Sequence, residues 1–117
     1  MSEAREIEPR RAAEMIEQGA PVVDVRDPDE YEAGHIAGAK HIPWTELNAE
    51  TAGVEEGGQV VFYCRTGDRS STAATAFEGS GYDAYSVAGG LEAWAESGLP
   101  LEPEDGKVAE RAGLPPR

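Results

Sequence analysis

The stretch QVVFYCRTGDRSSTAATAFEG, residues 59–79, decides how this 117-residue chain folds. Residues 59–63 are mostly apolar, β-branched or aromatic, which predicts a short buried strand. The strand runs into Cys64, the only cysteine of the sequence. Residues 65–69 then form a tight loop, and the hydroxyl-rich and alanine-rich residues 70–77 predict a helix with serine hydroxyls at its N-cap.

A strand, a tight loop and a helix in this order create a particular setting for the cysteine. The Cys64 sulfur is expected at the bottom of a ring of backbone N–H groups, at the positive end of the helix, with Arg65 and Arg69 close by. A helix N-terminus stabilises an anion by up to about 2 kcal/mol in a partly buried site. The alternative is an inert core cysteine. The glycine, arginines and hydroxyls that follow favour a reactive thiolate, because core packing requires none of them.

Composition limits the possible partners and compartments. The length predicts one domain, and a net charge of −13 disfavours nucleic acid and anionic membranes as partners. No apolar run approaches the roughly 20 residues of a membrane span, and the first residues lack a signal sequence, so a cytoplasmic location is expected. One cysteine and two separated histidines provide neither an internal disulfide nor the spacing of a metal site.

The rest of the chain alternates between helical and strand patterns. Helices are predicted over residues 9–17, 27–34, 44–47 and 91–97, strands over residues 21–26, 39–42 and 82–87, and a polar connection over residues 48–58. This alternation indicates a parallel α/β sheet with helices on both faces. Residues 102–117 read as an acidic, turn-rich C-terminal extension, either lying on the body or loose, with one helical turn at residues 108–111.

Three polar residues outside the loop are expected to be structural. Asp24 and Arg26 stand at the end of a predicted buried strand, where such residues more often form a hydrogen-bonded pair than a catalytic one. His35 is expected to anchor a turn, because a thiolate nucleophile has little need of a general base.

Three stretches together resemble the single-domain rhodanese family of sulfurtransferases. They are VDVR at residues 23–26 with EY at 30–31, GHIAGA at 34–39 and IP at 42–43; CRTGDRS at 64–70; and GGLEAW at 89–94 with GLP at 98–100. The resemblance covers about residues 5–101, and three motifs in the right order and spacing are very specific. It implies a rhodanese-like three-layer sandwich, with a mainly parallel five-stranded sheet and helices on both faces, in a domain of residues 1–101 followed by the extension of residues 102–117.

The family resemblance also implies a reaction of two displacements. The Cys64 thiolate attacks the outer sulfur of thiosulfate, releases sulfite and keeps a persulfide, and cyanide or a small or protein thiol then accepts the sulfur. No metal or organic cofactor is implied. The implied donor-binding residues are Arg65, Thr66, Gly67, Asp68, Arg69 and Ser70.

Within this implied site each loop residue has an expected role. Arg65 and Arg69 would bind the sulfonate end of the donor, the alternatives being a solvated pair or a partner for Asp68. Gly67 permits a positive φ in the tight loop. Ser70 is expected to cap the following helix, and the Thr66 hydroxyl could face the pocket.

Two rival classes remain open. Phosphatases and arsenate reductases of this fold carry an arginine six positions after the cysteine, whereas here Arg69 is fifth and Ser70 is sixth, and the shorter ring suits a single sulfur atom. Non-catalytic rhodanese-like interaction modules typically lack the cysteine that this chain keeps. A sulfur carrier that takes its sulfur from a persulfidated protein would have the same pocket.

The charge of the chain leads to a kinetic expectation. A body at −13 repels the thiosulfate dianion at long range, while Arg65 and Arg69 attract it locally. Because the Debye length shrinks to about 8–10 Å near physiological ionic strength, moderate salt screens the distant repulsion first. The second-order rate with thiosulfate is therefore expected to rise with moderate salt in stopped-flow measurements. A monotonic fall would show that local attraction dominates.

Overall fold

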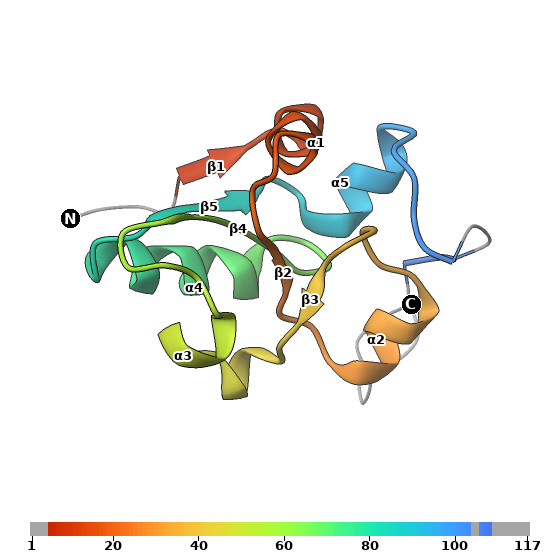
Figure 1. The fold of residues 1–117 in the computed structure, drawn as a ribbon. Helices are drawn as coiled ribbons and strands as arrows, with labels where there is room; N and C mark the ends of the chain where they lie inside the picture. The colour runs from red at the N-terminus through yellow and green to blue at the C-terminus, as the bar shows by residue number, and fades with distance from the viewer. Residues whose placement is uncertain (1–4, 104–105, 109–117) are drawn as a thin grey trace.

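The computed structural model describes residues 5–103 and 106–108 of the chain. Five strands form one parallel sheet in the order β1-β5-β4-β2-β3 (Figure 1). The strands are β1 (Arg5–Ile7), β2 (Val22–Asp24), β3 (Lys40–His41), β4 (Gln59–Tyr63) and β5 (Asp83–Val87). The predicted α/β class with a five-stranded sheet is confirmed, and every pairing between these strands is parallel.

Helices cover both faces of this sheet. They are α1 (Pro9–Glu17), α2 (Pro28–Ala33), α3 (Ala49–Ala52), α4 (Asp68–Gly79), α5 (Gly90–Glu96) and the 3₁₀ turn η1 (Trp44–Glu46). Figure 1 shows α3 and α4 on one side of the sheet and α1 and α5 on the other. In the described part of the chain, no helix combines the length and the apolar character needed to cross a membrane.

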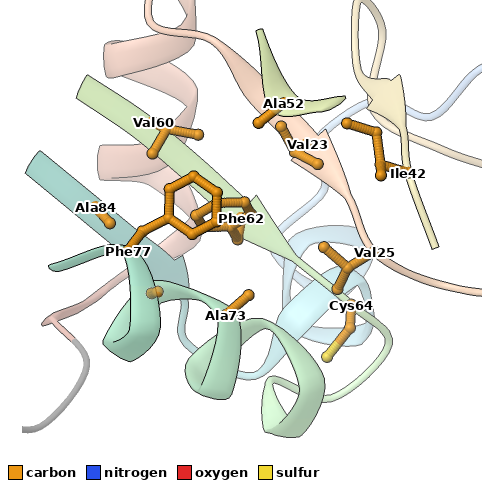
Figure 2. Close-up of a cluster of buried hydrophobic side chains, with 11 residues drawn as sticks. Val23, Val25, Ile42, Ala52, Val60, Phe62, Cys64, Ala73, Phe77 and Ala84 are labelled. Carbon is orange, nitrogen blue, oxygen red and sulfur yellow. The ribbon is translucent and has the colours of Figure 1, made fainter. Parts of the chain in front are cut away.

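The central strand β4 and Cys64, which follows it directly, distribute their side chains between the two faces of the sheet. Phe62 and Cys64 point toward α4 and belong to one buried cluster (Figure 2), whereas Val61 and Tyr63 pack on the side of α1 and α5. All four residues are at most 1% exposed. Because successive side chains of a strand alternate, this register places the Cys64 sulfur against the N-terminal turn of α4, and a slip of one residue would place it on the other face.

The structure corrects three details of the sequence prediction. Helix α4 begins at Asp68 with Gly67 at its N-cap, so Ser70 lies inside the first turn and does not cap the helix. The expected polar connection at residues 48–58 contains the short helix α3. The Asn48 side chain caps this helix by accepting a hydrogen bond of 2.9 Å from the Thr51 N–H. Strand β1 was not predicted, because three residues of mixed polarity at a sheet edge carry no clear pattern.

Asp24 and Arg26 form the structural pair that their position predicts. Arg26 Nη2 lies 2.7 Å from Asp24 Oδ2, Arg26 Nε lies 3.0 Å from Asp24 Oδ1, and both side chains are fully buried. Arg26 Nη2 also donates to the Gly34 carbonyl at 2.7 Å. The pair thereby fixes the end of β2 to the end of α2.

The described part of the C-terminal segment lies on the body of the protein. Glu102 and His35 exchange two backbone hydrogen bonds of 2.7 and 2.9 Å, and the Lys107 N–H donates to Ala33 at 2.8 Å. Leu101 and Val108 pack against the core cluster on the side of α5. The helical turn expected at residues 108–111 falls outside the described residues beyond Val108. The division into a domain of residues 1–101 and an extension stays a prediction.

The buried pair leads to a stability prediction. Asp24→Asn leaves the Arg26 guanidinium buried without its counter-charge and is expected to reduce the free energy of unfolding by about 3–5 kcal/mol. The double variant Asp24→Asn/Arg26→Met removes both charges and should lose less than the sum of the two single changes. Urea denaturation of wild type, Asp24→Asn, Arg26→Met and the double variant measures these free energies of unfolding. Losses that simply add in the double variant would contradict the coupling between the two residues.

Candidate active site

Hydrogen-bond donors of the loop and of helix α4 converge on the sulfur of Cys64. The Gly67 N–H lies 3.1 Å from Sγ, the Ser70 N–H lies 3.5 Å from it, and the Ser70 hydroxyl also lies 3.5 Å from it. Cys64 itself is 1% exposed. The sulfur therefore faces the amide-lined cup expected from the sequence, at the positive end of α4.

Helix α5 orients the peptide planes of this loop. The Leu91 N–H donates to the Cys64 carbonyl at 2.8 Å, and the Glu92 N–H donates to the Arg65 carbonyl at 3.1 Å. In a trans peptide the N–H points opposite to the carbonyl. With these two carbonyls turned to α5, the N–H groups of Arg65 and Thr66 point away from α5.

The glycine pair before α5 allows this close approach. A Cβ at Gly90 would lie 2.5 Å from the carbonyl oxygens of both Cys64 and Arg65. A Cβ at Gly89 would lie 2.6 Å from the Ala93 Cβ, and both glycines have positive φ, +73° and +62°. The sequence GGLEAW thus brings the N-terminus of α5 into contact with the loop that carries the cysteine.

The remaining loop residues divide into buried and exposed ones. Gly67 has the positive φ expected for it, +110°, which turns the chain into α4. Thr66 and Asp68 are exposed, and the hydrogen bonds to the sulfur come from Gly67 and Ser70. Asp68 stands in the first turn of α4, where its negative charge complements the helix dipole.

Both loop arginines are paired with carboxylates from other elements. Arg65 Nη1 lies 2.9 Å from Glu92 Oε2 on α5, and Arg69 contacts both oxygens of Glu30 on α2, at 2.9 and 3.1 Å. Burial lowers the pKa of Arg69, but the hydrogen bonds and charge of Glu30 outweigh it, so this pKa lies above its usual value. Asp68 is not the partner of either arginine, and the two arginines do not form a solvated pair at the rim of the loop.

Sequence reasoning missed three residues of the site, namely Glu30, Ser86 and Glu92. Glu30 is fully buried and also accepts the Asp27 N–H at 3.1 Å, as the third helical residue of α2 does in a capping box. Ser86 is a fully buried hydroxyl on β5, and strand alternation with Ala84 could have indicated its burial. Nothing in the sequence pairs Glu92 with Arg65.

His35 anchors a turn, as expected. Its Nδ1 lies 2.9 Å from the Tyr31 carbonyl, and its ring stacks on the Tyr31 ring with centroids 3.9 Å apart and planes inclined by 10°. These contacts secure the residues that follow α2. His35 also exchanges backbone hydrogen bonds with Glu102. The hydrogen bonds to the sulfur come from the loop and α4 and do not involve His35.

Comparison with known proteins identifies the class. The model of the rhodanese-like domain matches residues 8–97, and the chain belongs to this family. Among similar proteins, thiosulfate sulfurtransferase GlpE of Pseudomonas fluorescens (strain Pf0-1) is 42% identical over 95 residues, which cover 80% of this chain and 87% of that protein. GlpE of Pseudomonas putida (strain F1) is 37% identical over 110 residues, covering 92% and 99% of the two chains.

Solved structures show the same fold. A protein from Bacillus halodurans aligns with a TM-score of 0.76 and 26% identity, over 92% of this chain and 82% of its own. A rhodanese-related protein from Thermoplasma volcanium aligns with a TM-score of 0.71 and 34% identity, over 83% of this chain and 96% of its own. The predicted rhodanese-like architecture is thereby confirmed.

The two arginine pairs should contribute unequally to stability. Glu30→Gln breaks a pair whose side chains are 0% and 12% exposed, and about 3 kcal/mol of unfolding free energy is expected to be lost. Glu92→Gln is the matched control, because Glu92 is 39% exposed and its pair should contribute about 1 kcal/mol or less. Equal losses in chemical denaturation would mean that burial of Glu30 does not govern the strength of its pair.

Proposed function

We propose that this protein is a thiosulfate sulfurtransferase that carries the transferred sulfur as a persulfide on Cys64. The observation that carries the proposal is the convergence of the Gly67 and Ser70 N–H groups and the Ser70 hydroxyl on Sγ. The names of the GlpE relatives and the rhodanese-like family match support the same activity.

In the first displacement the Cys64 thiolate attacks the outer sulfur of thiosulfate. The Cys64 sulfur–sulfur bond forms as the sulfur–sulfur bond of thiosulfate breaks, and sulfite leaves with the electron pair of the broken bond. The product is an anionic persulfide. Backbone N–H groups already aimed at the sulfur stabilise this charge without having to reorganise during the reaction.

In the second displacement a nucleophile attacks the outer sulfur of the persulfide. Cyanide would leave as thiocyanate, and a small thiol or a protein thiol would leave as a persulfide. The electron pair of the broken bond returns to Cys64 as the thiolate, so the enzyme needs no oxidant or reductant. Two separate displacements through one covalent intermediate predict ping-pong kinetics.

Within this proposal the two loop arginines keep their expected role. The Arg65 and Arg69 guanidinium groups are assigned to the sulfonate of the donor, through the N–H groups that their carboxylate partners leave available. The residues from Thr66 to Asp68 act through the backbone, because their side chains are exposed or, in Gly67, absent. The acceptor class, cyanide or a thiol, and the cytoplasmic location stay predictions.

The geometry does not favour the phosphatase alternative. Ser70 occupies the sixth position after the cysteine, and its N–H and its hydroxyl both lie within 3.5 Å of the sulfur. Arg69 stands one position earlier, at the fifth position, so the sixth position carries no guanidinium group for a phosphate. A buried sulfur among donors this close suits one added sulfur atom better than a tetrahedral oxyanion.

Intact-mass spectrometry tests the proposal directly. After incubation with thiosulfate, the wild-type protein is expected to gain the mass of one sulfur atom, and added cyanide should remove it with release of thiocyanate. Cys64→Ser is the control and should gain nothing. An unmodified wild-type protein, or turnover of an aryl phosphate well above that of thiosulfate, would reject the assignment.

A further inference from the structure

A second buried hydroxyl lies behind the residue that contacts the sulfur. Ser86 is in β5, opposite Phe62 in the parallel register with β4, and it is fully buried. Its Oγ lies 2.8 Å from Ser70 Oγ. Among the residues that the structure describes, Ser70 is the one hydrogen-bond partner of the Ser86 hydroxyl.

Counting protons decides the direction of this hydrogen bond. Each hydroxyl has one proton to donate, and Ser86 has only the Ser70 oxygen within reach among the described residues. If Ser70 donated to Ser86, the Ser86 proton would be buried without an acceptor, which is unfavourable. Ser86 therefore donates to Ser70.

The Ser70 proton is then free for another acceptor. Two lie within reach, the Gly67 carbonyl at 3.3 Å and the Cys64 sulfur at 3.5 Å. An anionic acceptor forms the stronger hydrogen bond, so a thiolate draws this proton toward the sulfur. Donation from Ser86 also polarises the Ser70 hydroxyl and makes it a better donor.

We propose that Ser86 is a positioning residue of the active site, which directs the Ser70 hydroxyl proton to the Cys64 sulfur. The three groups form a hydroxyl relay, Ser86 to Ser70 to Cys64. Ser86 acts only through Ser70 and does not touch the sulfur. The inference rests on the proposed function, because the relay stabilises negative charge on the sulfur and the proposed reaction needs an anionic sulfur.

Charged groups around the loop must stay constant in a test, since the charge of Arg69 interacts with Cys64. They are the charged side chains of the loop and of the start of α4, Arg65, Asp68 and Arg69, the carboxylates paired with the two arginines, Glu30 and Glu92, and Asp27, whose charge acts on Arg69. None of them is hydrogen bonded to Ser70 or Ser86 among the described residues. Variants at the two serines therefore change the relay and leave these charges in place.

The test is a double-variant cycle on the ionisation of Cys64. A hydrogen bond to a charged group is worth about 1.5–3 kcal/mol, so in Ser70→Ala the ultraviolet absorbance of the thiolate should appear about one to two pH units higher than in wild type. Ser86→Ala should shift it in the same direction, by about half a unit to one unit, because Ser70 remains as a weaker donor. The double variant should match Ser70→Ala alone.

Sulfur transfer provides the second readout. Loss of the relay should reduce kcat/KM for thiosulfate about three- to tenfold at acid pH, where less thiolate forms, and leave it near wild type at alkaline pH. A change that only weakened the fold would lower activity at every pH. Ser71→Ala is the matched control, because it removes a serine hydroxyl from the next position of α4, outside the relay.

The outcomes separate the two proposals. A wild-type protein that forms no persulfide rejects the proposed function. If wild type forms the persulfide and Ser86→Ala titrates like wild type, the relay is rejected. Shifts of Ser70→Ala and Ser86→Ala that simply add in the double variant also reject it, because Ser86 would then act on the sulfur by another route. Thermal unfolding verifies that each variant is folded during the assay.

Discussion

Two hydrogen bonds from the backbone of α5 determine the chemistry of the cysteine loop. Leu91 and Glu92 bind the carbonyls of Cys64 and Arg65, and this orients the two peptide planes that follow the sulfur. Had these carbonyls pointed into the cup, they would place partial negative charge beside the sulfur. Because the carbonyls point outward, hydrogen-bond donors line the cup. Gly90 allows α5 to come close enough to bind these two carbonyls.

The cup stabilises an anion inside a protein whose net charge is −13. Formal positive charge contributes less to this than the sequence suggests, because Arg65 and Arg69 each have a carboxylate at about 3 Å. Among the described residues, two N–H groups and one hydroxyl lie at hydrogen-bonding distance from the sulfur. Such dipoles act over a few ångströms, so they are effective in a small, water-poor site despite an acidic surface.

Local patterns allowed much of the fold and part of the site to be predicted. Strand β4, Cys64 and the turn at Gly67 follow from residues that are neighbours in the sequence. A run of hydroxyls before alanines predicts a helix cap at Ser70, but the helix begins earlier, at Asp68, because of the left-handed turn at Gly67.

Other parts of the site depend on contacts between residues far apart in the chain. Glu30 lies 39 positions from Arg69, Glu92 lies 27 positions from Arg65, and Ser86 lies 16 positions from Ser70. Helix and strand periodicity report which side of an element is buried, and they do not report which distant side chain lies opposite. Only the packing of α2, α5 and β5 around the loop shows these partners.

The dependence of the loop on α5 has a consequence for biosynthesis. A nascent chain that has emerged only through α4 contains Cys64 and every other residue of the loop, but not the amides of Leu91 and Glu92 that hold its carbonyls. β5, which separates β1 from β4 in the sheet, is also late in the sequence. The thiol can therefore acquire its final surroundings only after most of the domain has left the ribosome, and incomplete chains would bear an ordinary cysteine.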